Sequence, residues 1–214
     1  MSVQRIAILG GTFNPVHNGH IALAKGFARL LGLQQVMLMV TNVPPHKRAP
    51  DLASGEDRLA MCRLAAEEEP LLSANDFELR RPGKSYTWET LTLLQKQMPQ
   101  AELFFITGAD MFLTLEQWKH PERIFSLCTV CAAPRGEDSS APLRQYAQHL
   151  QAQGARAVIG DFVPPDISST QIRKLAGEGK SLRGLVPSSV EHYILQHELY
   201  RSAAPQEKGI FHDI

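Results

Sequence analysis

Two histidines near the start of the chain, His17 and His20, lie where a strand-like segment is followed by a helix-like one. An apolar tetrad leads into Gly10 and Gly11, and residues 21–31 show the apolar spacing of a helix. Glycine lets a backbone approach a ligand closely, and a helix N-terminus offers unpaired N–H groups to anions. Imidazoles three residues apart can both reach one side of the first helical turn and donate to a phosphate oxygen. The spacing therefore indicates a phosphate site.

Two other interpretations of the histidine pair stay open at this point. Paired histidines can bind a metal, but residues 6–20 contain no Glu, Asp or Cys to supply a third ligand, which disfavours zinc. A tight turn with two solvated histidines is the simplest alternative. The other polar segments of the chain have to distinguish these interpretations.

A second possible anion site comprises residues 167–173, which read Ile-Ser-Ser-Thr-Gln-Ile-Arg after the Pro164-Pro165 turn. A helix that starts with hydroxyl residues and has Arg173 about one turn later offers an anion three kinds of group. These are backbone N–H donors, OH groups and a bidentate cation. By itself the segment fits an ordinary capped helix with a surface arginine at least as well. Together with the histidine pair it favours a polyphosphate ligand.

The elements that position these groups follow from hydrophobic periodicity. Strand-like runs alternate with helix-like ones, and this order predicts a parallel sheet that is buried on both faces. Ligands of such sheets gather beyond the carboxyl ends of the strands. The predicted strands are residues 6–9, 35–40, 71–79, 102–106, 127–133 and 155–159. The predicted helices are residues 21–31, 58–69 with a capping signal from Ser54 to Asp57, 85–98, 142–152, part of 160–184 and 190–199.

The loop after the second predicted strand, residues 41–48, therefore lies at the same sheet edge as the histidines. Prolines stiffen this loop, and its basic cluster of His46, Lys47 and Arg48 suits a polyphosphate. In isolation a basic loop is usually solvated surface. Its expected place in the sheet makes it part of a possible site.

The GGTFxPxHxGH form of the first motif resembles the bacterial nicotinate-mononucleotide adenylyltransferases of the nucleotidylyltransferase superfamily. Residues 167–173 resemble the second signature of that superfamily, ISSTxIR, and the resemblance extends over residues 4–201. It implies an α/β, Rossmann-like doubly wound fold, with a mainly parallel sheet and helices on both faces. It also implies transfer of AMP from ATP to nicotinate mononucleotide, with release of pyrophosphate, in NAD biosynthesis, and Mg²⁺ as the cofactor that accompanies ATP.

The resemblance also implies roles for individual residues. His17, His20, Lys47 and Arg173 are expected to neutralise and position phosphates during catalysis. Arg135 takes the place of an arginine in an RPG-like loop of the family, although the order here is Pro-Arg-Gly. The chain has Asn14 where the family usually has Asp, and an amide keeps the capacity to hydrogen bond. The full set expected to bind ATP is Gly10, Gly11, Thr12, Phe13, His17, His20, Arg135, Ile167, Ser169, Thr170 and Arg173.

The nicotinate mononucleotide site is implied in the same way. Tyr86 and Thr87 open a helix whose N–H groups suit a carboxylate, although such a start is normally only a cap. Trp118 offers a stacking face, although an isolated tryptophan is more often a core anchor. The set expected to bind this substrate is Asn42, Lys47, Tyr86, Thr87, Gly108, Asp110 and Trp118.

Three cysteines, Cys62, Cys128 and Cys131, form a sparse set of odd number, which is typical of reduced thiols. Cys128 and Cys131 have CxxC spacing, but residues three apart in a strand point to opposite faces. No second pair completes a zinc site. We expect both to be core residues, and no residue is assigned to a metal.

The 214 residues are 43% hydrophobic, which is enough for one substantial core. We expect one domain over residues 1–201 and a flexible C-terminal tail over residues 202–214. Lys plus Arg equals Asp plus Glu at 22 each, so no overall charge favours nucleic acid or an anionic membrane. The sequence shows no signal region or long apolar run, so we expect a cytoplasmic protein of undetermined oligomeric state that acts on small molecules.

Two competing functions stay open. Both motifs also occur in other adenylyltransferases of the superfamily, such as one acting on phosphopantetheine, and in cytidylyltransferases. The pyridine substrate is favoured by four further features, which are the PPHK loop, the SYT helix start, Gly108-Ala109-Asp110 and Trp118. A nucleotide-binding regulatory protein without turnover is an alternative of a different class. Pyrophosphate release from ATP and an acceptor distinguishes these functions.

Overall fold

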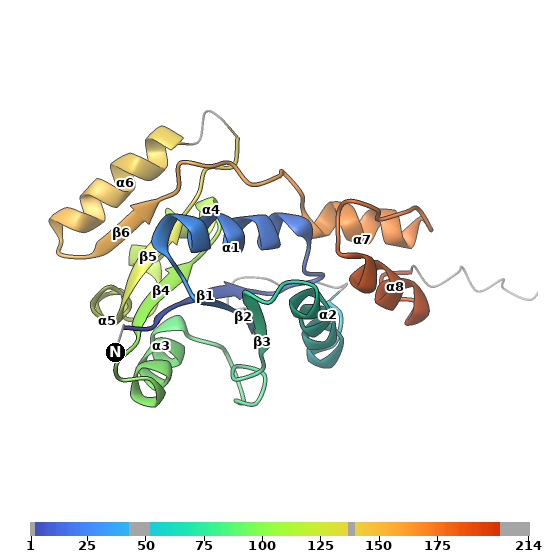
Figure 1. Cartoon of the computed structure of the whole chain (residues 1–214), viewed down its shortest axis with the longest axis horizontal. Helices are drawn as coiled ribbons and strands as arrows, with labels where there is room; N and C mark the ends of the chain where they lie inside the picture. Colours follow the sequence, from blue (N-terminus) through green and yellow to red (C-terminus); the bar gives the residue numbers. More distant parts are fainter. Residues whose placement is uncertain (1–2, 43–51, 137–139, 202–214) are drawn as a thin grey trace, which may run out of the picture.

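A six-stranded parallel sheet in the order β3-β2-β1-β4-β5-β6 forms the centre of the computed structural model, which describes residues 3–42, 52–136 and 140–201 (Figure 1). The strands are β1 (Arg5–Gly11), β2 (Gln35–Val40), β3 (Leu72–Asn75), β4 (Glu102–Ile106), β5 (Cys128–Ala132) and β6 (Arg156–Ile159). The helices are α1 (Asn18–Leu31), α2 (Gly55–Glu67), α3 (Thr87–Gln97), α4 (Ala109–Phe112), the 3₁₀ turn η1 (Leu115–Gln117), α5 (Pro121–Leu127), α6 (Ser140–Ala152), α7 (Ser169–Gly177) and α8 (Ser188–Gln196). The predicted α/β fold is confirmed.

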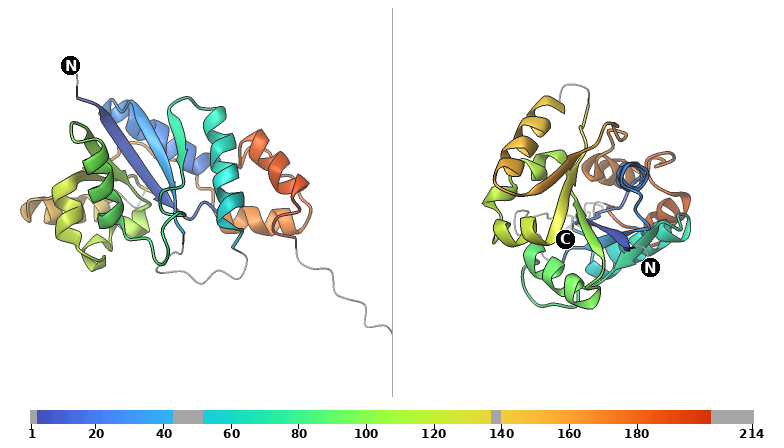
Figure 2. Two further views of the ribbon diagram at one scale, coloured as in Figure 1. Left: turned by 90° about the horizontal axis from the view of Figure 1, so that it is seen from below. Right: turned by 60° about the vertical axis from the view of Figure 1, so that its left-hand side comes forward.

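Side chains alternate across the sheet and build a separate apolar core on each face. In β1, for example, Ala7 and Leu9 belong to one core, while Ile6 and Ile8 belong to the other. The first core is covered by α1, α2, α7 and α8, and the second by α3, α5 and α6. Figures 1 and 2 show α7 and α8 beside α2 at one end of the molecule. The predicted doubly wound arrangement, with helices on both faces, is therefore confirmed.

The strand order reverses between β1 and β4, which are hydrogen-bonded neighbours. The chain adds strands outward from β1 through β2 to β3, and then from β4 through β5 to β6. Connections from β1 and β4 consequently leave toward opposite faces of the sheet. A crevice at the carboxyl ends of these two strands is the usual ligand site of such a fold.

The strand predicted over residues 71–79 is wrong in its second half, because β3 ends at Asn75. The Asn75 side chain accepts a hydrogen bond from the N–H of Phe77 over 2.9 Å, which turns the chain locally. A further turn follows, in which Arg80 N–H donates to Asp76 O. The predicted capping signal of α2 is confirmed, since the Ser54 hydroxyl accepts from Asp57 N–H over 3.0 Å.

The expectation for the CxxC pair is also confirmed. Both residues are buried, with Cys128 in one core and Cys131 in the other. Burial raises the pKa of the Cys128 thiol to about 12, which keeps it protonated at neutral pH. In the described part of the chain, no helix has the length and apolarity that crossing a membrane requires. The predicted tail, residues 202–214, lies outside the described residues.

Candidate active site

The two histidines stack on each other at the N-terminus of α1. Their ring centroids are 3.6 Å apart with an interplanar angle of 26°. The backbone N–H of His17, the N-cap residue, donates to Nδ1 of His20 over 3.2 Å. His17 is only 6% exposed and His20 is half-buried, so the alternative of two solvated histidines in a turn is wrong. Because Nδ1 of His20 accepts a hydrogen bond, its proton lies on Nε2.

The environment of the histidine pair keeps both imidazoles neutral at neutral pH. Burial, together with the positive charge of Arg135, lowers the pKa of His17 to about 4. Burial also lowers the pKa of His20 well below its ordinary value, and the neighbouring His17 adds to this effect. Each ring therefore offers one N–H donor and no net charge in the absence of a ligand.

Close packing explains the glycines around the histidines. A Cβ on Gly11 would come within 2.9 Å of the Phe13 ring, which is buried and lies edge-on to His20 at 5.0 Å. A Cβ on Gly19 would come within 3.1 Å of the Pro165 carbonyl. The glycine of HxGH thus lets α1 approach the segment that precedes α7.

Helix α7 brings the second motif onto the first loop. The Ser169 hydroxyl donates to the Pro15 carbonyl over 3.0 Å, and Arg173 Nη1 donates to the Asn14 carbonyl over 2.9 Å. The Nη2 group of Arg173 also lies 3.4 Å from the Thr170 hydroxyl. Two motifs about 150 residues apart in sequence therefore lie in contact at the end of β1.

The remaining residues predicted to bind ATP lie near this contact. Arg135 forms an ion pair with Asp166, whose Oδ1 is 2.7 Å from Nε. Ile167 is half-buried and packs against the core beneath α7. Thr12 follows β1 directly, and its carbonyl accepts from Arg58. The structure thus gathers this predicted set around the carboxyl end of β1.

Asn14 is 4% exposed and serves as a junction of three segments. Its side-chain oxygen accepts from the N–H of Ala53 over 3.1 Å and from the Tyr200 hydroxyl over 2.9 Å. Burial raises the pKa of Tyr200, so the phenol remains a donor. Only the oxygen of the amide is needed for these two bonds, and a carboxylate could accept both.

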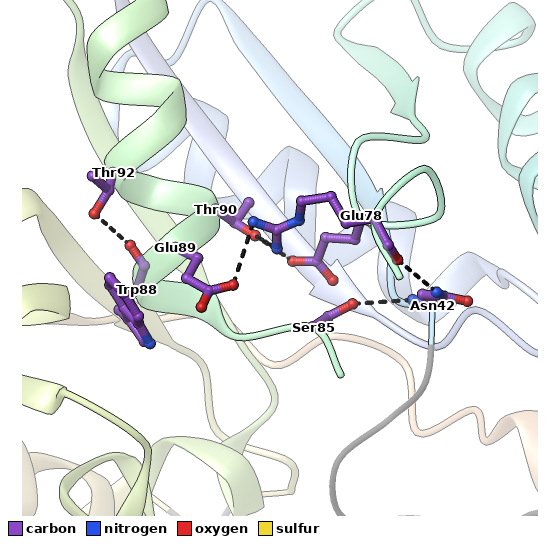
Figure 3. Close-up of polar contacts among 8 residues, drawn as sticks. Asn42, Glu78, Ser85, Trp88, Glu89, Thr90 and Thr92 are labelled. Atoms are coloured by element: carbon purple, nitrogen blue, oxygen red, sulfur yellow. Dashed lines mark hydrogen bonds and ion pairs between the residues drawn. The ribbon is translucent and has the colours of Figure 1, made fainter. Parts of the chain in front are cut away.

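A second group of predicted residues lies at the ends of β2 and β4. Asn42, directly after β2, donates through its backbone N–H to the Ser85 hydroxyl over 3.2 Å and through Nδ2 to the Arg81 carbonyl over 2.9 Å (Figure 3). One of the two side-chain N–H donors of Asn42 is therefore used within the protein. Tyr86 is the N-cap of α3 and makes no side-chain cap bond, and Thr87 is the first residue of that helix.

The residues after β4 complete this group. Gly108 is the N-cap of α4, and Asp110 is exposed in its first turn. The Trp118 indole Nε1–H donates to the Thr114 hydroxyl over 3.1 Å, and its ring meets Phe105 edge-on at 5.9 Å. Lys47, which was assigned to both catalysis and substrate binding, lies outside the described residues.

Two basic residues near the predicted set were missed by the sequence interpretation. Lys119 Nζ lies 4.5 Å from the centre of the Tyr86 ring. Arg58 is 2% exposed and donates to four backbone carbonyls, those of Ala53, Thr12, Thr41 and Asn42, over 2.8 to 3.3 Å. A sequence signal existed for Arg58, which precedes the apolar positions Cys62 and Ala65 by four and seven residues on one helix face.

Comparison with known proteins gives one consistent family. A sequence profile described as cytidylyltransferase-like matches residues 8–175. A relative from Synechococcus sp. (strain JA-3-3Ab), named "Probable nicotinate-nucleotide adenylyltransferase", is 43% identical over 199 residues, which cover 92% of this chain and 95% of the relative. A relative of the same name from Symbiobacterium thermophilum is 38% identical over 199 residues, covering 92% and 96%.

Solved structures agree with the fold. The nicotinic acid mononucleotide adenylyltransferase of Plasmodium falciparum, complexed with NaAD, matches with a TM-score of 0.73 at 16% identity, over 92% of this chain and 97% of that one. The same protein complexed with APC matches with a TM-score of 0.71. At this level of identity, the likeness supports the shared architecture.

Proposed function

The chain belongs to the cytidylyltransferase-like family, and we propose that it transfers AMP from ATP to nicotinate mononucleotide, producing nicotinate adenine dinucleotide and pyrophosphate in NAD biosynthesis. The shared name of relatives that align over nearly their whole length supports this substrate pair. The observation in the structure that carries the proposal is the contact of Arg173 with the Asn14 carbonyl, which joins the two nucleotide motifs at the end of β1.

The proposed reaction needs no covalent intermediate. The phosphate of nicotinate mononucleotide has a second pKa near ~6, so it is largely dianionic at neutral pH and attacks without a general base. One of its oxygens forms a bond to the α-phosphorus of ATP. The bond from that phosphorus to the bridging oxygen of the β-phosphate breaks, and pyrophosphate leaves with the electron pair. Positioning and charge neutralisation then account for catalysis.

Residues around the end of β1 have the chemistry for the phosphate side of this reaction. We propose that Nε2–H of His20 donates to a phosphate oxygen, since its Nδ1 is occupied by the His17 backbone. Arg173 supplies the positive charge that the neutral histidines lack. The proposed role of Lys47 rests on the sequence resemblance alone.

Residues at the ends of β2 and β4 fit the pyridine side. The N-terminus of α3 at Tyr86 has no side-chain cap, so its N–H groups can face a carboxylate. Lys119 adds a positive charge beside the same tyrosine. Trp118 offers an aromatic surface at the neighbouring strand end. A ring carboxylate therefore fits this end of the site better than a neutral amide.

We propose that Mg²⁺ enters with ATP. Among the described residues, no group of three or more His, Cys, Asp or Glu side chains could hold a metal ion. Mg²⁺ commonly keeps water and substrate phosphate oxygens as ligands, and it then neutralises phosphate charge. We further propose that residues 1–201 act as one nucleotidylyltransferase domain, because the contacts of α7 join the C-terminal part of the fold to the first loop. The cytoplasmic location stays a prediction.

The direct test is pyrophosphate release by the purified chain with ATP, Mg²⁺ and a panel of acceptors. We expect release with nicotinate mononucleotide and a dinucleotide product of the corresponding mass. Phosphopantetheine as the preferred acceptor, or CTP as the preferred nucleotide, would identify another transferase of the family. Binding of ATP without release with any acceptor would identify a regulatory protein.

A further inference from the structure

Glu78 is a buried carboxyl group to which no function has been assigned so far. It lies in the turn after β3 and is 6% exposed. The Thr90 hydroxyl of α3 donates to its Oε1 over 2.7 Å (Figure 3). Glu78 therefore joins the turn after β3 to α3, the helix that begins after Tyr86.

The Ser85 and Thr90 hydroxyls each accept a hydrogen bond from a neighbouring residue. The Ser85 oxygen accepts from the Asn42 N–H over 3.2 Å, and the Thr90 oxygen accepts from Arg81 Nη2 over 3.2 Å. The Thr90 hydroxyl therefore links Glu78, to which it donates, with Arg81, from which it accepts. The Arg81 carbonyl in turn accepts from the Asn42 side chain, so the bonds continue from Arg81 to Asn42 and from there to Ser85.

These bonds fix the position of residues on the pyridine side of the proposed site. Asn42 is held by Ser85 and Arg81, and Tyr86 follows Ser85 directly in the chain. None of the hydrogen bonds of the cluster joins it to the two histidines or to α7. The cluster therefore belongs to the pyridine side, and Arg58, which donates to the carbonyls of both Asn42 and Thr12, links it to the ATP side.

We infer that Glu78 and Thr90 are positioning residues for the pyridine mononucleotide, because they fix the spacing between Asn42 at the end of β2 and Tyr86 at the start of α3. This inference rests on the proposed function. It implies that loss of the Glu78 to Thr90 bond raises the KM for nicotinate mononucleotide and leaves the KM for ATP unchanged. A role in folding alone would lower the thermal midpoint without separating the two KM values.

Helix α3 offers a matched pair of variants, Thr90→Val and Thr92→Val. The Thr92 hydroxyl donates to the Trp88 carbonyl of its own helix over 2.7 Å and is not bonded to Glu78. Both changes replace a hydroxyl by a methyl group of similar size. We expect Thr90→Val to raise the KM for nicotinate mononucleotide about two- to tenfold, as for one lost hydrogen bond, and Thr92→Val to leave it unchanged. Thr90→Ser keeps the hydroxyl and should behave as the wild type.

Glu78→Leu tests the carboxyl group itself, because it removes the oxygen that accepts from the Thr90 hydroxyl. We expect a larger rise in the same KM, with the KM for ATP within about twofold of the wild type. Thermal melts show whether this variant folds. If it does not fold, the kinetics of Thr90→Val test the inference.

Three results would overturn the inference. The first is an unchanged KM for nicotinate mononucleotide in folded Thr90→Val. The second is an equal rise in the KM values for nicotinate mononucleotide and ATP. The third is the same rise in the KM for nicotinate mononucleotide in Thr92→Val. Absence of turnover by the wild-type protein would instead refute the proposed function, and the inference would fall with it.

Discussion

Arg173 of α7 donates a hydrogen bond to the backbone carbonyl of Asn14 in the first loop, over 2.9 Å and across 159 residues of sequence. The side-chain oxygen of the same Asn14 accepts from Tyr200, near the end of the described chain. The C-terminal part of the fold therefore binds the first loop at both the backbone and the side chain of Asn14. Its shape depends on residues that no local pattern connects to it.

Asn14→Asp should leave kcat/KM within about tenfold of the wild type, because a carboxylate can accept from Ala53 N–H and from Tyr200 as the amide does. Asn14→Leu removes the acceptor and should lower stability by about 1 to 3 kcal/mol, since two buried donors lose their partner. Steady-state kinetics and urea unfolding measure the two effects. Complete loss of activity in Asn14→Asp would show that the site requires the neutral amide.

His20→Asn should lower kcat by about a hundredfold or more, because the proposed Nε2–H donor to phosphate is lost. The asparagine oxygen can still accept from the His17 N–H, so the start of α1 is expected to persist. His20→Ala should lose the same activity and also some stability, since His20 is half-buried and stacked on His17. Wild-type kcat in a folded His20→Asn protein would remove this histidine from the mechanism.

The pH dependence of stability should reveal His17. Its pKa is lowered from 6.5 to about 4 in the folded chain, so below pH 6.5 the unfolded chain binds a proton that the folded chain does not. The free energy of unfolding should therefore fall with decreasing pH, by roughly 3 kcal/mol from this residue once pH 4 is reached. Urea unfolding of wild type and His17→Asn from about pH 7.5 to 4.5 tests this. Parallel curves for the two proteins would contradict it.

Arg58→Lys should lower the free energy of unfolding by about 2 to 4 kcal/mol, because a lysine cannot reproduce the planar set of bonds to four buried carbonyls. Arg63→Lys is the matched control on the same helix. Arg63 is largely exposed and lies 3.9 Å from Asp76, so its replacement should change stability by less than about 0.5 kcal/mol. Equal effects of the two changes in urea unfolding would show that the buried bonds of Arg58 contribute little.

Nicotinate mononucleotide should be preferred over the amide form by about 10- to 100-fold in kcat/KM, because the N-terminus of α3 and Lys119 favour the carboxylate. Trp118→Ala should weaken the use of both substrates similarly, since the pyridine ring is common to both. Lys119→Met should lower only the preference, by about two- to fivefold, as for one exposed charge. Equal use of both mononucleotides by the wild type would refute recognition of the carboxylate.

Much of the fold follows from the sequence because it is encoded locally. The hydrophobic patterns predicted six strands and most of the helices, and residues 35–40 and 102–106 match β2 and β4. The short helices between β4 and β5 were not predicted. Parallel order followed from alternation of strands and helices, and this order brought the ends of β1, β2 and β4 to one edge. The identities of the two nucleotide motifs were likewise visible as short stretches of sequence.

Only the tertiary structure determined how these residues are paired and how far they are buried. The stacking of His17 on His20 and the neutral state of both rings depend on burial by other segments. Glu78 lies in residues 71–79, which were predicted to be a strand, and its hydrogen-bond partner Thr90 comes from α3. The hydrogen-bond partners and the burial of these side chains come from segments that are distant in sequence. Local residue spacing does not determine which distant groups come into contact.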